Sequence, residues 1–140
     1  LAAAHHPKAR LHVHYDERGV GFFALGIAKA LEGPAAIIVT SGTAVGNLLP
    51  SVMEARYSYT PLILLTADRP PELQQAGANQ TCNQKNIFSP FVKEEIDLPT
   101  SDAKVKESYV RSSIAHASLL AEELAGPVHI NWYIREPLYA

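Results

Sequence analysis

Apolar and polar residues follow one another along the chain in patterns that predict strands and helices in turn. Residues 11–16 (LHVHYD) alternate between the two kinds and are predicted as a half-exposed strand. Residues 35–40 (AAIIVT) and 61–67 (PLILLTA) are continuously apolar, which is typical of strands covered on both faces of a sheet. A further strand is predicted at 128–132 (VHINW), and residues 91–98 can form an edge strand.

Two helices are predicted between the first three strands. The first ends at Gly33-Pro34, and its apolar residues recur every three or four positions. They are Val20, Phe23, Ile27 and Leu31. The segment SGTAVGN opens the second helix, which runs to about Arg56, and Pro50 predicts an internal kink or an early break.

A third, longer helix is predicted from Ser101, its expected N-cap, to Gly126-Pro127. Its apolar face comprises Val110, Ile114, Ala117, Ala121 and Leu124. Strands and helices therefore alternate along most of the chain. This order predicts an α/β fold, with an open, mainly parallel sheet and helices on both faces.

Composition narrows the class of protein. The chain has 140 residues, of which 47% are hydrophobic and 19% charged, so we expect one folded domain. A net charge of −2 argues against a partner that is a nucleic acid or an anionic membrane, and no apolar run is long enough to span a bilayer. The single cysteine, Cys82, excludes an internal disulfide and is expected to be an inert thiol. Because the chain starts at Leu1 and stops after an apolar stretch, we expect a piece of a longer protein.

Ligands of open α/β sheets bind beyond the carboxyl ends of the strands. This rule selects residues 16–18, 40–43, 66–69 and whatever follows Trp132. In each of these places, however, the same residues also have a purely structural interpretation.

The TSGTAVGN turn could present its amides to a ligand at a helix N-terminus. It has neither the lysine of a P-loop nor a GxGxxG pattern, and Ser41 does not lie in the GxSxG pattern of a nucleophile elbow. The structural alternative is a tight turn in which Thr43 is the N-cap. Glu17 could be catalytic, or could simply be an acidic residue in a first helical turn.

Other polar residues are also open to two interpretations. His12 and His14 would share one face of a strand and could bind a metal, although no third ligand lies nearby. Residues 68–72 (DRPPE) are expected to form a rigid turn with an ion pair inside it. Asn79 and Gln80 can orient a polar ligand, but loops also carry such amides for solubility.

Five segments together resemble the pyrimidine-binding N-terminal domain of the SEPHCHC synthases, thiamine-diphosphate enzymes of menaquinone and phylloquinone biosynthesis. They are DERGVGFFALGIAKA, TSGTAVGNLLPSVMEA, PLILLTADRPPEL, GANQT and GPVHINWYIREPLY. The resemblance implies that residues 1–140 form a single pyrimidine-binding domain. It also implies that this domain lacks the family's opening strand, its upstream arginine motif and the diphosphate-binding domain.

The resemblance also implies roles for individual residues. Glu17 stands at the position of the catalytic glutamate that hydrogen-bonds the N1′ nitrogen of the cofactor aminopyrimidine and thereby favours its imino tautomer. Thr40, Thr43 and Asn47 match the turn that faces the cofactor in the wider superfamily.

Further implications concern substrates and assembly. Gln80 matches a loop amide that reaches the cofactor and, with Asn79, orients the substrate. The expected reaction is decarboxylation of 2-oxoglutarate and addition of the succinyl unit to isochorismate, a transferase (carboligase) reaction. Mg²⁺ would be held by the diphosphate-binding domain. A homodimer or homotetramer in the cytoplasm, or in a plastid stroma, is expected, and this fragment alone should be inactive.

Two alternatives stay open at this point. The chain could be a non-catalytic scaffold of the same fold, which predicts no dependence on thiamine diphosphate. It could also belong to an acetolactate-type or oxalyl-type thiamine-diphosphate decarboxylase, although GANQT and TADRPPEL favour the first family.

Overall fold

A computed structural model describes residues 2–102 and 104–136 of the chain. Within them, one open sheet contains four strands in the order β1-β2-β4-β3, each parallel to its neighbours. The strands are β1 (Ala35–Val39), β2 (Leu62–Asp68), β3 (Glu94–Leu98) and β4 (Pro127–Tyr133). The edge position expected for the strand at 91–98 is confirmed, because β3 is the last strand of the sheet.

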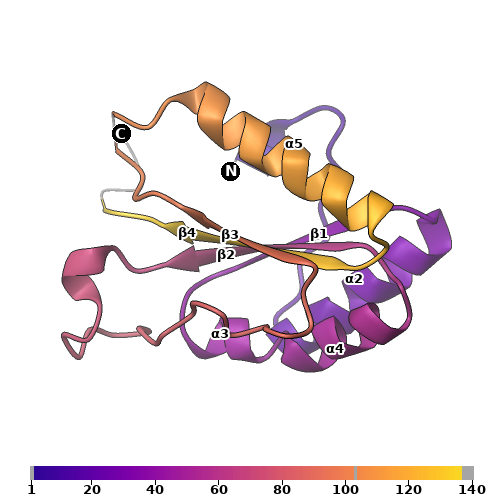
Figure 1. Cartoon of the computed structure of the whole chain (residues 1–140), viewed down its shortest axis with the longest axis horizontal. Coiled ribbons are helices and arrows are strands. Elements are labelled where there is room, and N and C mark those ends of the chain that lie inside the picture. Colours follow the sequence, from indigo (N-terminus) through magenta and orange to yellow (C-terminus); the bar gives the residue numbers. More distant parts are fainter. Residues whose placement is uncertain (1, 103, 137–140) are drawn as a thin grey trace.

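Helices cover both faces of this sheet (Figure 1). Figure 1 places α5 (Glu107–Glu123) on one face and both α3 (Thr43–Gly46) and α4 (Leu49–Tyr57) on the other. Helix α2 (Glu17–Leu31) packs against α4 and β1, on the same face as α3 and α4. The short elements are α1 (Ala2–His5) and the 3-10 turn η1 (Pro71–Leu73). The predicted α/β class, with a parallel sheet between helical layers, is therefore confirmed.

The sheet separates two apolar cores, because successive strand residues point to opposite faces. Leu62 and Leu64 of β2 belong to the core beneath α2, α3 and α4, which also buries Phe88 completely. Ile63 points to the other core, where it meets Ala117 and Ala121 of α5 with β3 and β4 residues. None of the helices in the described ranges is long and apolar enough to cross a membrane.

The strand predicted at 11–16 is wrong. These residues form no ladder, and they are exposed, with Val13 at 79% and Tyr15 fully accessible. The His14 ring instead hydrogen-bonds the backbone of Asp16, within the same segment. An alternating pattern forms a strand only beside another strand, and the described part of the chain contains none next to this segment.

Strand β1 differs from its prediction in burial. Alternate residues are buried against α2, but Ile38 on the other face is 66% exposed. The reason is that α5 packs on β4, β3 and β2 and does not extend over β1. The continuous apolar run therefore forms an edge strand covered on one face within the described residues.

Two helix starts also differ from the predictions. The second predicted helix is divided into α3 and α4 just before Pro50, as one of the two expected outcomes. Its N-cap is Gly42 rather than Thr43, because Thr43 is already helical. Helix α5 begins at Glu107 with Lys106 as N-cap, so Ser101 is not its cap.

The ion pair expected inside the DRPPE turn is wrong as well. Glu72 pairs with Arg135, and Arg69 lies 3.7 Å from Glu136, so both pairs join the turn to the segment after β4. The Arg135 guanidinium, followed by local backbone hydrogen bonding, lowers the pKa of Glu72 to about 2. Residues 137–140, the end of the GPVHINWYIREPLY segment, lie outside the described residues.

Candidate functional site

Glu17 is held at the carboxyl edge of the sheet by the start of α2. Asp16 is the N-cap, and its carboxylate accepts a hydrogen bond of 2.5 Å from the Gly19 amide. An acidic residue in the first turn is also favoured by the positive end of the helix dipole. This local arrangement fixes the Glu17 backbone and leaves its side chain half-buried.

A cavity of about 290 Å³ lies beside Glu17, and we call it the Glu17 hollow. Its walls are the side of α2 at Val20, the end of β1 and residues 11–14. Thr40, the first residue after β1, also lines it. The hollow is therefore lined by the Glu17 carboxylate, the Thr40 hydroxyl group and the rings of His12 and His14 as well as by apolar side chains.

Asn47 connects this hollow to the joint between α3 and α4. Its side-chain Nδ2 lies 3.5 Å from Glu17 Oε2, a long and therefore weak hydrogen bond in which Asn47 is the donor. The structure thus brings Glu17, Thr40 and Asn47 to one place, although they come from three different elements.

The turn at 41–43 lies against the loop that follows β2. Gly42 has φ +80°, where glycine is favoured, and a Cβ added there would lie 3.1 Å from the Gln80 carbonyl oxygen. Ser41 Oγ donates a hydrogen bond of 2.8 Å to that same oxygen. The Gly42 amide donates another, also 2.8 Å, to Gln84 Oε1.

The remaining candidate residues do not line the Glu17 hollow. Gln80 approaches the turn through its backbone, and its own φ is +52°. Asn79 accepts a hydrogen bond from Thr81 through its backbone carbonyl. Thr43 is exposed at the start of α3 and is not among the residues that line the Glu17 hollow. The structure thus gives Thr43 and Asn79 no side-chain contact with Glu17 in the described part of the chain.

A buried polar network lies behind this turn, and sequence reasoning missed it. Gln84 Nε2 donates to the Ala67 carbonyl and to Asn131 Oδ1, and Thr66 Oγ1 donates to the same Asn131 oxygen. Asn131 in turn donates to Asp68. A signal was present in the strands themselves, where Thr66 and Asn131 interrupt otherwise apolar runs.

The network continues to the edge strand β3. His129 is fully buried, with Nε2 lying 2.8 Å from Thr66 Oγ1 and Nδ1 lying 3.2 Å from Glu95 Oε2. Burial acts to raise the pKa of Glu95, but hydrogen bonds from His129 and the Asn86 amide, with the charges of His129 and Lys85, outweigh it and leave that pKa lowered. The ionised form of Glu95 is therefore stabilised by its hydrogen bonds in the folded protein.

Two other groups near the site have shifted pKa values. Burial, assisted by the Asp68 charge, raises the pKa of the Cys82 thiol, which agrees with the expected inert thiol. Burial followed by the charges of Asp97 and Asp68 raises the pKa of Tyr133. Neither group is therefore activated for nucleophilic chemistry.

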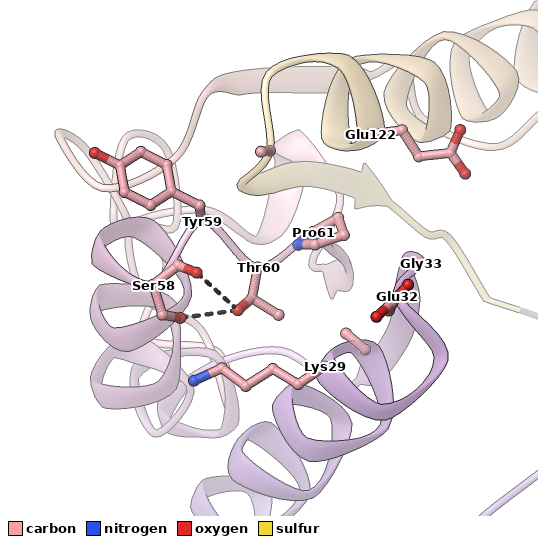
Figure 2. Close-up of a pocket in the computed structure, with 10 residues that line it drawn as sticks. Lys29, Glu32, Gly33, Ser58, Tyr59, Thr60, Pro61 and Glu122 are labelled. Carbon is pink, nitrogen blue, oxygen red and sulfur yellow. Dashed lines mark hydrogen bonds between the residues drawn. The ribbon is translucent and has the colours of Figure 1, made fainter.

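A second hollow, of about 370 Å³, lies at the opposite edge of the sheet, where the strands begin (Figure 2). Gly33, two residues before β1, and Pro61, directly before β2, line it. Figure 2 shows that the Ser58 and Thr60 hydroxyl groups bond to each other, at 2.8 Å. Although this hollow is larger, it contains none of the candidate residues, and ligands of such sheets bind at the other edge.

The histidines expected to share a strand face do not do so. His12 and His14 lie in the irregular segment before α2, and the His12 ring stacks edge-on against Phe23. Within the described residues, no group of three or more histidine, cysteine, aspartate or glutamate side chains is placed to hold a metal ion.

Comparison of the sequence with known protein families gives one match. Residues 1–87 match the family described as thiamine pyrophosphate enzyme, N-terminal TPP binding domain, and this range includes all six candidate residues. They are Glu17, Thr40, Thr43, Asn47, Asn79 and Gln80.

Curated relatives match over almost the whole chain. The chain is 50% identical over 139 residues to the 2-succinyl-5-enolpyruvyl-6-hydroxy-3-cyclohexene-1-carboxylate synthase of Aliivibrio fischeri, and 52% identical over 139 residues to that of Chloroflexus aurantiacus. Each alignment covers 99% of this chain and 24% of the relative. The enzyme of the same name from Haemophilus influenzae is 49% identical over 128 residues, which are 91% of this chain and 22% of the relative.

The chain thus spans about a quarter of the length of the curated relatives that it matches. The family match covers more than half of this chain, and the observed α/β fold with a parallel sheet agrees with it. The chain belongs to the family of thiamine pyrophosphate enzymes, as an N-terminal TPP-binding domain.

Proposed function

We propose that this chain is the pyrimidine-binding domain of a longer thiamine-diphosphate enzyme with SEPHCHC synthase activity. The observation that carries the proposal is the position of Glu17, which lines a hollow of mixed apolar and polar character together with Thr40 and lies beside Asn47. The high identity to synthases of that name supports the choice of this branch of the family.

The residues around the Glu17 hollow fit an aminopyrimidine ring. Such a ring has apolar faces and polar nitrogens at its edge, so it needs apolar walls with few polar partners. Val20 and Val39 supply apolar wall. Glu17 and Thr40 supply a carboxylate and a hydroxyl group, and His12 and His14 add ring nitrogens on the side of residues 11–14. The donor set therefore agrees with a bound pyrimidine.

In this proposal the side chains of the chain hold and orient the cofactor. When bound, thiamine diphosphate supplies a carbon nucleophile for 2-oxo acids and accepts the electron pair left when carbon dioxide departs. Glu17 shares a proton between its carboxyl oxygen and the N1′ nitrogen of the pyrimidine. Asn47 orients the Glu17 carboxylate, and Thr40 limits how the ring can rotate.

The same proposal includes the substrates, the roles of the other candidate residues, the metal and the assembly. The relatives' name supports isochorismate and 2-oxoglutarate as the substrates of the whole protein. Asn79 and Gln80 orient the substrate, and Thr43 contributes to the cofactor turn. Mg²⁺ and the diphosphate are bound by a domain outside these residues. The whole protein is a homodimer or homotetramer, and residues 1–140 alone bind the cofactor weakly and catalyse no turnover.

The deciding experiment uses the full-length protein that contains this chain. Isochorismate consumption is followed at saturating 2-oxoglutarate, with and without thiamine diphosphate and Mg²⁺, and cofactor binding is measured separately by calorimetry. Consumption that requires the cofactor is the expected result.

The two other outcomes select the alternatives. Cofactor binding without isochorismate consumption would contradict the synthase and favour an acetolactate-type or oxalyl-type decarboxylase. If the protein shows no cofactor binding and no isochorismate consumption, the proposal of an enzyme is contradicted. The chain would then be a scaffold of this fold.

A further inference from the structure

We propose that residues 80–84 clamp the 41–43 turn, and that Gln84 and Ser41 are positioning residues for the cofactor site. The inference rests on the proposed function, because it concerns the same edge of the sheet. Two hydrogen bonds form the clamp: Gly42 amide to Gln84 Oε1, and Ser41 Oγ to the Gln80 carbonyl.

The orientation of the Gln84 side chain is determined by its surroundings. Gln84 is 1% exposed, and its Nε2 faces two acceptors, the Ala67 carbonyl at 3.0 Å and Asn131 Oδ1 at 2.9 Å. Its Oε1 faces the Gly42 N–H. If the side-chain amide rotated by half a turn, its NH2 group would face the Gly42 N–H, and its oxygen would face the oxygens of Ala67 and Asn131. Only the observed orientation therefore satisfies all these groups.

The other end of the clamp is anchored in the centre of the sheet. Ala67 lies on β2 and Asn131 on β4, which are paired in the middle of the strand order. Asn131 is itself held by Thr66 and Asp68. A loop amide that is bonded to two central strands can therefore hold a turn at a fixed position, which a freely moving loop side chain cannot do.

The turn that is held lies between two residues of the proposed site. Thr40 directly precedes it and lines the Glu17 hollow, and Asn47 follows it at the end of α3, within reach of Glu17. Loss of the bond to Gln84 would leave the buried Gly42 amide without this partner, and the turn would move to find another. Thr40 and Asn47 would then shift relative to Glu17, and the cofactor would bind less tightly.

The test compares three variants of the full-length protein. Gln84→Leu removes the buried clamp bond at similar side-chain volume. Ser41→Ala removes the second clamp bond and leaves the buried network intact. Gln74→Leu is the matched control, because the Gln74 amide also ties this loop region to Asp68 and the Arg69 carbonyl, and within the described residues it makes no hydrogen bond to the turn.

We expect the KM and Kd for thiamine diphosphate to rise about 10-fold in Gln84→Leu and about 3-fold in Ser41→Ala, as the loss of one hydrogen bond implies. The kcat at saturating cofactor should stay within about 2-fold of the wild type, and Gln74→Leu should change neither constant. This split distinguishes positioning from general destabilisation, which would lower the fraction of active protein and hence the apparent kcat without raising KM.

Each other result overturns the inference. If the wild-type protein binds the cofactor, and the KM and Kd for thiamine diphosphate are unchanged in Gln84→Leu and Ser41→Ala, the clamp is overturned while the proposed function stands. An equal effect of Gln74→Leu would overturn it too. If Gln84→Leu does not fold, the KM of Ser41→Ala decides. If the wild-type protein binds no thiamine diphosphate, the proposed function fails and the clamp has no site to position.

Discussion

Glu17 is the side chain whose replacement should affect the reaction most. In Glu17→Gln the shape is kept, but the amide cannot share a proton with a ring nitrogen as a carboxyl group does, so we expect kcat to fall by about 100-fold or more. The measurement is isochorismate consumption by the full-length protein at saturating cofactor and substrates. Glu32→Gln is the matched control, because Glu32 caps the far end of the same helix.

The two variants should behave differently in activity and alike in folding. Circular dichroism and thermal unfolding should match the wild type in both, since neither side chain is buried. Near-normal turnover in Glu17→Gln would show that this carboxylate has no part in proton sharing.

Sequence reasoning selected some residues of the candidate site and missed others for a physical reason. Thr40 follows from the rule that ligands bind where parallel strands end. The same rule selected Glu17 through a strand at 11–16 that the structure does not contain, and the resemblance to a family gave Glu17 its role and added Asn47. The contacts of Ser41 and Gln84 depend on how two segments about 40 residues apart meet in space. In the sequence, Gln84 is one of several amide side chains in a polar loop, and nothing there distinguishes it from its neighbours.

Glu95 should contribute stability that depends on pH. Its lowered pKa in the folded state means that the unfolded chain, with an ordinary value of 4.5, binds more protons in acid. The contribution is therefore complete above about pH 4.5 and is lost as the pH falls through the lower, folded-state pKa. Glu95→Gln should cost about 2 kcal/mol near neutral pH, as for a hydrogen bond to a charged group.

Thermal unfolding of the chain between pH 3 and pH 8 measures this effect. The difference between wild type and Glu95→Gln should shrink on acidification, whereas Glu94→Gln, at an exposed position of the same strand, should change little at any pH. A difference that is constant with pH would mean that Glu95 acts through packing alone.

At the scale of elements, the predictions failed where an element lacks a neighbour. The first helix was expected to bury Val20, Phe23, Ile27 and Leu31, but these residues line a cavity of about 520 Å³ beside the edge of β1. Arg10, Leu11 and His12 form its other side, and Phe23 is 45% exposed. Periodicity identified an apolar face correctly but could not say whether the structure supplies a partner for it.

We expect this cavity to receive a further strand in the full-length protein, beside β1 and next to residues 11–16. Hydrogen exchange read out on peptides tests the idea. In residues 1–140 alone, β1 should exchange faster than the central strand β4, because half of its amides point away from β2. In the full-length protein, β1 should be protected about as strongly as β4.

Strand β4 is the internal control, since it is paired on both sides in either protein. Fast exchange of β1 in both proteins would mean that its outer edge stays open and that the apolar face of α2 has another role.

At the scale of the whole molecule, topology assembles the site. All strands of the described sheet run in the same direction, so their carboxyl ends meet at one edge. The side chains and turns that form the candidate site therefore meet at this edge, although they are far apart in sequence. They are Glu17, Ser41, Gly42, Asn47, Gln80 and Gln84. Element order alone predicted this edge.

The proposed homo-oligomer can be tested through its cofactor, on the hypothesis that a second subunit completes the site. A ligand that binds only the assembled form stabilises it, by about 2.7 kcal/mol when its concentration is 100 times its Kd. Thiamine diphosphate with Mg²⁺ at 100 times its Kd should therefore lower the subunit dissociation constant of the full-length protein about 100-fold for each site that is filled only in the assembled form. Mass photometry over a dilution series measures this change, with Mg²⁺ alone as the control. A dissociation constant that ignores the cofactor, or full activity in diluted monomers, would mean that one subunit binds thiamine diphosphate by itself.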